Sequence, residues 1–162
     1  MSELPPCGIY RTVKPIGSVE AGRLVYFHNH GNPGPGVYFP EKWAHNRAQF
    51  AQNGMTVPQD FDPSALHALP VEGFYRVAKE FHCCPKQCAK FEPDTFVQLG
   101  YNGNGKAIVF VPELNANGMS IPERGSAVDD DRLGNLVLLK VAIREGATQK
   151  MDLSIPRGFI VH

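Results

Sequence analysis

The sequence predicts a mainly β protein built from two tandem copies of a small barrel-like unit. The first observation is an ordered repeat, in which GIYR at 8–11, VYFPE at 37–41 and GMTVP at 54–58 are matched by GFYR at 73–76, VFVPE at 109–113 and GMSIP at 118–122. The separations are 65, 72 and 64 residues (73 − 8, 109 − 37 and 118 − 54), as insertions in separate loops of a duplicated unit would produce. The second observation is that 14 prolines and 16 glycines interrupt the chain, which favours short strands joined by turns over long helices.

The repeat divides the chain into a first β unit at residues 8–70 and a second at residues 71–162, the latter with a C-terminal closing strand. Each copy has about the size and strand number of an SH3-like barrel, which is an analogy of size and strand count alone. The segment 69–76 runs from one copy into the next without a linker. We therefore expect the two copies to pack together as one compact body.

In the first copy, strand candidates lie at 9–16, 23–30 and 37–39, which are rich in β-branched and aromatic residues. The exception is the segment at 42–53. Its residues Trp43, Arg47 and Phe50 recur at helical spacing, and Gly54 follows as a helix-ending glycine. This pattern predicts one short helix near residues 42–53.

In the second copy, strand candidates at 96–99 and 107–111 flank the sequence YNGNG at 101–105, a strong hairpin signal. The segment 136–143 is the most apolar strand candidate, and 151–161 is expected to add the closing strand. Four side chains from the two copies are expected to be substantially buried: Tyr10, Tyr75, Leu136 and Leu138.

The charges balance, with 16 basic and 16 acidic residues. Nucleic-acid binders normally carry a basic excess that neutralises phosphates, so neither nucleic acid nor an anionic membrane surface is expected as a partner. Residues 1–7 lack the pattern of a signal peptide, and no stretch approaches about 18 apolar residues. We expect a cytoplasmic protein, whose cysteines would be thiols or metal ligands rather than disulfides.

Three of the four cysteines lie within six residues of the second copy, beside a histidine. Thiolates and imidazoles are the usual zinc ligands, and a Cys-x3-Cys spacing lies within the range of structural zinc sites. A zinc ion is the predicted cofactor, with these candidate ligands: Cys84, Cys88, Cys83, Cys7 and His82. The distal half of a normal zinc motif is absent, so a disulfide or free thiols remain as alternatives.

A second candidate metal site is the sequence His28-Asn29-His30, because alternate residues of a strand point to the same face. Glu41 and His45 are the candidate oxygen and nitrogen donors that would complete it. The alternative interpretation is that these are polar residues at a strand end leading into a turn.

No catalytic set is complete in the sequence, so no catalytic residue is predicted and an enzyme is not favoured. The main hypothesis is a non-catalytic protein-binding or adaptor module with a structural zinc ion at the cysteine insertion. Trp43 could cap a barrel end or anchor the unidentified protein partner. The alternatives are a small metalloenzyme that uses His28 and His30, and a structural subunit of a larger assembly.

Overall fold

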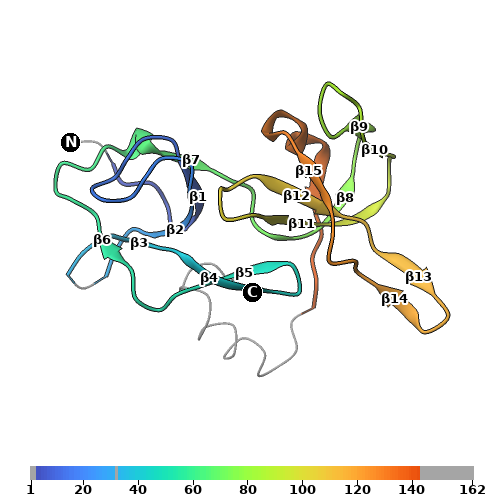
Figure 1. The fold of residues 1–162 in the computed structure, drawn as a ribbon, viewed down its shortest axis with the longest axis horizontal. Coiled ribbons are helices and arrows are strands. Elements are labelled where there is room, and N and C mark those ends of the chain that lie inside the picture. The colour runs from blue at the N-terminus through green and yellow to red at the C-terminus, as the bar shows by residue number, and fades with distance from the viewer. Residues whose placement is uncertain (1–2, 32, 143–162) are drawn as a thin grey trace.

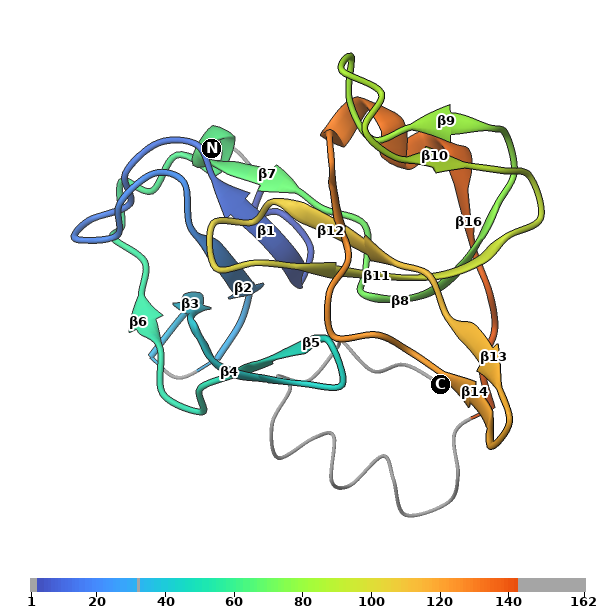
Figure 2. The same ribbon diagram turned by 45° about the vertical axis from the view of Figure 1, so that its right-hand side comes forward.

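The structure, a computed structural model, describes residues 3–31 and 33–142, and within them the chain is mainly β (Figure 1). Two five-stranded antiparallel sheets lie side by side, one formed by the N-terminal half and one by the C-terminal half (Figures 1 and 2). No sheet among these residues closes into a barrel, so the expected barrel-like units are not confirmed. The mainly β class is confirmed, and the SH3-like character stays a prediction.

The first sheet has the strand order β6-β3-β2-β1-β7. Its strands are β1 (Gly8–Thr12), β2 (Leu24–His28), β3 (Gly36–Tyr38), β6 (Met55–Thr56) and β7 (Leu66–Ala68). A 3₁₀ turn, η1 (Pro63–Ala65), precedes the last strand. It begins there because the Asp62 side chain accepts a hydrogen bond from the Ser64 amide and Pro63 needs no amide partner in the first turn.

The second sheet has the order β15-β12-β11-β8-β16. Its strands are β8 (Gly73–Val77), β11 (Phe96–Tyr101), β12 (Ala107–Phe110), β15 (Ser126–Val128) and β16 (Leu136–Leu138). A 3₁₀ turn, η2 (Asp130–Asn135), again precedes the last strand. The strands β1, β2 and β3 of the first sheet thus occupy the same places as β8, β11 and β12 of the second.

A matching detail appears at the first strand of each sheet. Tyr10 lies opposite Val25, and Tyr75 lies opposite Val97. Each tyrosine hydroxyl donates a hydrogen bond of 2.6 Å to the backbone carbonyl four residues earlier, at Pro6 and Val71 respectively. Both rings are buried, as expected from the sequence.

Three two-stranded hairpins extend from this framework. Their strands are β4 (Pro40–Ala44) with β5 (Arg47–Phe50), β9 (Phe81–His82) with β10 (Lys90–Phe91), and β13 (Glu113–Asn115) with β14 (Gly118–Ser120). The hairpins β9–β10 and β13–β14 project from different ends of the second sheet (Figures 1 and 2).

The predicted helix near 42–53 was wrong, because this segment forms the β4–β5 hairpin. Ala44 pairs with Arg47, so His45 and Asn46 form a two-residue turn, and their φ angles of 52° and 64° are those that a tight hairpin turn requires. Along β5, Ala48 and Phe50 are buried while Arg47 and Gln49 are partly exposed. This alternation packs one side of the hairpin into the core, and that packing outweighs the helical spacing of the side chains.

The larger hydrophobic core contains side chains from both sheets. Its members from the first half, Ile9, Leu24, Tyr26, Ala48, Phe50 and Leu69, contact members from the second half such as Tyr75, Val97, Leu99, Tyr101 and Val109. A smaller core lies within the first half. The division at residues 70 and 71 stays a prediction.

Leu136 and Leu138 are less buried than expected. Leu136 is half-buried and Leu138 is 53% exposed, because β16 is a three-residue edge strand with β8 as its neighbour on one side. The predicted closing strand at 151–161 lies outside the described residues.

Candidate metal centres

Two clusters of thiols and imidazoles stand out among the described residues. In each cluster, one ligand atom from every member lies within 4.8 Å of those of the others. The first cluster is Cys83, Cys84 and Cys88, and the second is Cys7, His28 and His30. We call them the trithiol cluster and the Cys-His cluster.

The trithiol cluster lies in the loop between β9 and β10. Phe81 and Phe91 stack at 4.8 Å between ring centroids and hold the base of this hairpin against the core. The Cys83 amide donates to the Ala89 carbonyl, and the Gln87 amide donates to the Cys84 carbonyl. Gln87 adopts a left-handed φ of 57°, which turns the chain back. The loop therefore curls so that its first and last thiols converge.

The electrostatics of the trithiol cluster favour one thiolate. A hydrogen bond from Cys83, 3.5 Å from it in sulfur–sulfur distance, and bonds from the backbone amides of residues 86–88 lower the pKa of Cys84. The negative charge on Cys84 raises the pKa of Cys88. Amide donors around a sulfur stabilise its anionic form, which is the form that binds metal.

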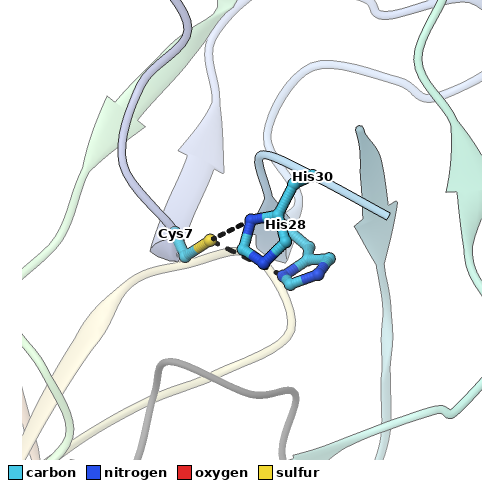
Figure 3. Close-up of side chains that lie close together, drawn as sticks. All are labelled: Cys7, His28 and His30. Atoms are coloured by element: carbon cyan, nitrogen blue, oxygen red, sulfur yellow. Dashed lines mark hydrogen bonds between the residues drawn. The ribbon is translucent and has the colours of Figure 1, made fainter. Parts of the chain in front are cut away.

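The Cys-His cluster follows from the register of the first sheet. Gly8 of β1 pairs with Phe27 of β2, so Cys7, one residue before β1, lies beside His28, one residue further along β2. His30 lies in the bend that follows β2, and its ring packs beside that of His28. Figure 3 shows the three side chains pointing toward one another.

Several polar atoms surround the Cys7 sulfur. His28 Nδ1 lies 3.5 Å away and His30 Nδ1 lies 3.9 Å away (Figure 3), and the imidazole rings are 4.0 Å apart between centroids. The Asn29 side-chain oxygen accepts from the thiol at 3.2 Å, and the Asn29 amide donates to the sulfur at 3.3 Å. Burial, followed by repulsion from His30, lowers the pKa of His28, which favours the neutral imidazole.

The remaining predicted site residues lie elsewhere. His82 is on β9 and Cys7 is in the Cys-His cluster, so neither belongs to the trithiol cluster. Glu41 is exposed on β4, and the His45 carbonyl accepts from Gln98 at the hairpin turn. Neither Glu41 nor His45 belongs to a ligand cluster among the described residues.

Trp43 is 43% exposed on β4, and its indole nitrogen donates to the Tyr101 carbonyl at 2.8 Å. The side chain is therefore attached to the second sheet through this hydrogen bond while part of it remains exposed to solvent. Asn29 was not among the predicted site residues, although its position between the two histidines was a signal in the sequence.

Disulfide bonds are absent, since all four cysteines lie within the described ranges and are free thiols. The helical turns of the described chain are too short to cross a membrane. Comparisons of the chain with models of protein families, with curated proteins and with solved structures find no match. The chemistry of the two clusters therefore carries the functional interpretation.

Proposed function

We propose that this protein is a non-catalytic zinc-binding module, built from two copies of one open β unit, that binds another protein in the cytoplasm. The proposal of a zinc site rests on the convergence of three thiols within 4.8 Å in one hairpin loop. Sulfurs that share a tetrahedral zinc ion stand roughly 3.8 Å apart, for zinc–sulfur bonds of about 2.3 Å. The spacing of the trithiol cluster is compatible with a single ion.

His82 is the fourth ligand in this proposal. It lies two residues before Cys84, at the end of β9 where the loop begins. The side chain is partly exposed, and a change of its rotamer would be needed to bring the imidazole to the sulfurs. A closed four-ligand site would make the ion structural, fixing the β9–β10 hairpin.

Zinc titration of variants tests this assignment. In a His28→Ala/His30→Ala chain, which removes the Cys-His cluster, we expect one zinc ion per chain. Adding Cys84→Ser/Cys88→Ser should abolish binding, and His82→Ala should weaken it. Because the ligands bind as thiolates, affinity should fall as the pH is lowered. Zinc binding that survives the loss of Cys84 and Cys88 would contradict the proposal.

Removal of zinc gives a second readout. Most of the apolar core lies outside the loop, which contributes Cys83 to it, so a chelator should lower the melting temperature without unfolding the protein at room temperature. Circular dichroism before and after chelation measures both effects. The Cys84→Ser/Cys88→Ser chain, which has no loop site to empty, is the matched control.

The duplication in this proposal is supported by the shared strand order, the 3₁₀ turn before each last strand and the paired tyrosine hydrogen bonds. The alternative metalloenzyme with Glu41 or His45 loses support, because these residues lie apart from His28 and His30. A structural subunit of a larger assembly would differ from the module in its oligomeric state, which light scattering measures.

A protein partner is favoured by the β13–β14 hairpin. Leu114 lies opposite Met119, so both side chains share one face of the hairpin, and they are 85% and 56% exposed. Covering a leucine side chain is worth about 1.5–3 kcal/mol, so such a pair favours an apolar protein surface. The balanced charge of the chain does not favour nucleic acid.

Photo-crosslinking in cells tests the partner. A photoreactive residue in place of Leu114 should give one discrete adduct, and adding Met119→Ser should weaken it. The same residue in place of Val13, which is 46% exposed on the other half of the chain, is the control. Equal adducts at positions 114 and 13, or none at 114, would argue against a partner on this hairpin.

A further inference from the structure

We propose that Cys7, His28 and His30 form a second metal site, separate from the trithiol cluster, for a borderline divalent ion such as zinc or cobalt. The site joins the N-terminal arm to the end of β2 and leaves one coordination position open to solvent. One thiolate and two imidazoles match the ligand preferences of these ions, which bind nitrogen and sulfur donors together.

The distances favour one shared ion. With a metal–sulfur bond of about 2.3 Å and a metal–nitrogen bond of about 2.05 Å, tetrahedral ligands place sulfur and nitrogen roughly 3.6 Å apart. The Cys7 sulfur lies 3.5 Å from His28 Nδ1 and 3.9 Å from His30 Nδ1 (Figure 3). The two sulfur–nitrogen distances therefore match those around a shared ion to within a few tenths of an ångström.

The polar groups around the sulfur are compatible with a shared ion. The Cys7 sulfur faces two imidazole nitrogens and the Asn29 side-chain oxygen, yet a thiol has one proton to donate. The Asn29 oxygen, in turn, lies 2.7 Å from His30 Nδ1 and 3.2 Å from the Cys7 sulfur. A cation bound to the sulfur and both nitrogens would replace the thiol proton and satisfy all three ligand atoms at once.

The cluster is held in place by groups that do not bind the ion. The Asn29 side-chain nitrogen donates to the Pro5 carbonyl at 3.2 Å, which fixes the amide with its oxygen toward the cluster. The Asn29 backbone amide donates a hydrogen bond to the Cys7 sulfur at 3.3 Å, which fixes the position of the sulfur. The Tyr10 hydroxyl donates to the Pro6 carbonyl, so the two residues before Cys7 are both held by hydrogen bonds.

The outer side of the cluster is open. Cys7 and His28 are partly buried, whereas His30 is exposed, and no carboxylate belongs to the cluster. Three protein ligands with one free position are typical of sites that hold an exchangeable water molecule. We therefore assign the fourth position to water or to a small anion from solution. This distinguishes the site from the closed ion proposed in the β9–β10 loop.

Cobalt(II) titration tests the site, because thiolate-bound cobalt has a charge-transfer band in the near ultraviolet and tetrahedral cobalt has strong visible bands. The titration uses a Cys83→Ser/Cys84→Ser/Cys88→Ser chain, so that Cys7 is the one remaining thiol. We expect both sets of bands to appear and to saturate at one ion per chain. Cys7→Ser should abolish the charge-transfer band, and either His28→Ala or His30→Ala should weaken the visible bands.

Asn29→Ala separates positioning from ligation. Loss of such a supporting residue costs about 10–100-fold in metal affinity while the ligands, and therefore the spectrum, stay the same. His67→Ala, a change of an exposed histidine on β7, is the control and should leave the affinity unchanged.

Absence of a charge-transfer band in the triple-serine chain would overturn the proposal, provided that circular dichroism shows it to be folded. If that chain does not fold, the stoichiometry of the parent chain decides. Cys7→Ser should reduce bound cobalt from two ions to one, and an unchanged stoichiometry would overturn the site. Because the trithiol cluster is untouched by Cys7→Ser, failure here is distinguishable from failure of the zinc proposal.

Discussion

Glu72 is a carboxylic acid in the interior of the protein. It is 5% exposed, and one of its oxygens accepts a hydrogen bond of 2.9 Å from the Ala48 amide on β5. The other oxygen has no hydrogen-bond partner within the part of the chain that the structure describes. Burial raises the pKa of Glu72 to about 7, against the opposing effects of the Ala48 amide and Arg47.

This raised pKa predicts that stability decreases with pH. Below about pH 4.5, Glu72 is protonated in both the folded and unfolded chains. Between about 4.5 and 7 the unfolded chain releases the proton and the folded chain retains it, so the free energy of unfolding falls; above 7 it stays low. The difference between about 7 and 4.5 corresponds to roughly 3 kcal/mol, an upper value for this group.

The Glu72→Gln variant should lose this part of the pH dependence. A neutral amide can still accept from the Ala48 amide but has no proton to release. Urea unfolding at several pH values should show that the free energy of unfolding of the variant rises relative to that of the parent chain as the pH rises through this range. Glu123→Gln, a change of an exposed carboxylate, is the control. A constant difference between Glu72→Gln and the parent would show that Glu72 does not titrate as its burial implies.

At the scale of single residues, the sequence indicated which residues could be metal ligands but not which of them lie together. All six residues of the two clusters are among the predicted metal ligands, because cysteine and histidine have few other roles in such patterns. Cys7 was assigned to the other cysteines, however, and the structure places it with His28 and His30. The contact of Cys7 with the two histidines depends on the register of β1 and β2, which the sequence alone does not specify.

The β4–β5 hairpin is the element that connects the two halves. Gln98 of β11, which is 2% exposed, donates to the His45 carbonyl at 2.9 Å and accepts from the Asn46 side chain at 3.1 Å. Asn46 also donates to the Pro122 carbonyl. Gly100 allows the close approach, since a Cβ atom there would lie 2.6 Å from the Asn46 carbonyl oxygen.

Gly100→Ala should therefore push the hairpin away from β11. The opposing atom belongs to the backbone and cannot turn aside, so we expect a loss of about 1–3 kcal/mol in the free energy of unfolding. Trp43 is the single tryptophan, and its indole nitrogen donates a hydrogen bond to the Tyr101 carbonyl in the folded state. Moving the hairpin away would break this bond and expose the ring, so the fluorescence emission of Trp43 should shift to the red. Gly134→Ala, where a Cβ meets open space, is the matched control. Equal stability of both variants would contradict this account of the docking.

The same element explains the error in secondary structure. Trp43, Arg47 and Phe50 fit a helical period, but a tight turn at His45 and Asn46 lets these residues fit a hairpin as well. The choice between them is made by contacts with β11, about 50 residues away in the chain. Local pattern carries no information about such contacts, whereas the hairpin between β11 and β12 was predictable from its own turn residues.

For the whole molecule, the ordered repeat indicated where strands would recur, and the strands at Tyr10 and Tyr75 occupy the same place in their sheets. Closure into a barrel could not be inferred in the same way. Strand number and length do not determine whether the first and last strands of a sheet meet, because that depends on twist and register. The contact between the halves is likewise a tertiary property, made by the shared core and by the ion pair of Arg11 with Asp130.

The shared core predicts a single cooperative unfolding transition. Leu24 lies on β2 of the first sheet and is fully buried in the cluster that contains Val97 and Val109 of the second, and its amide donates to the Gly103 carbonyl. Leu24→Ala should cost about 2–5 kcal/mol and lower the protection of second-sheet amides against hydrogen exchange as much as that of the first. Leu138→Ala, at a half-exposed position, is the control and should cost much less. Calorimetry should give one peak in each case, and a Leu24→Ala chain in which the first sheet melts while the second keeps its protection would show two independent domains.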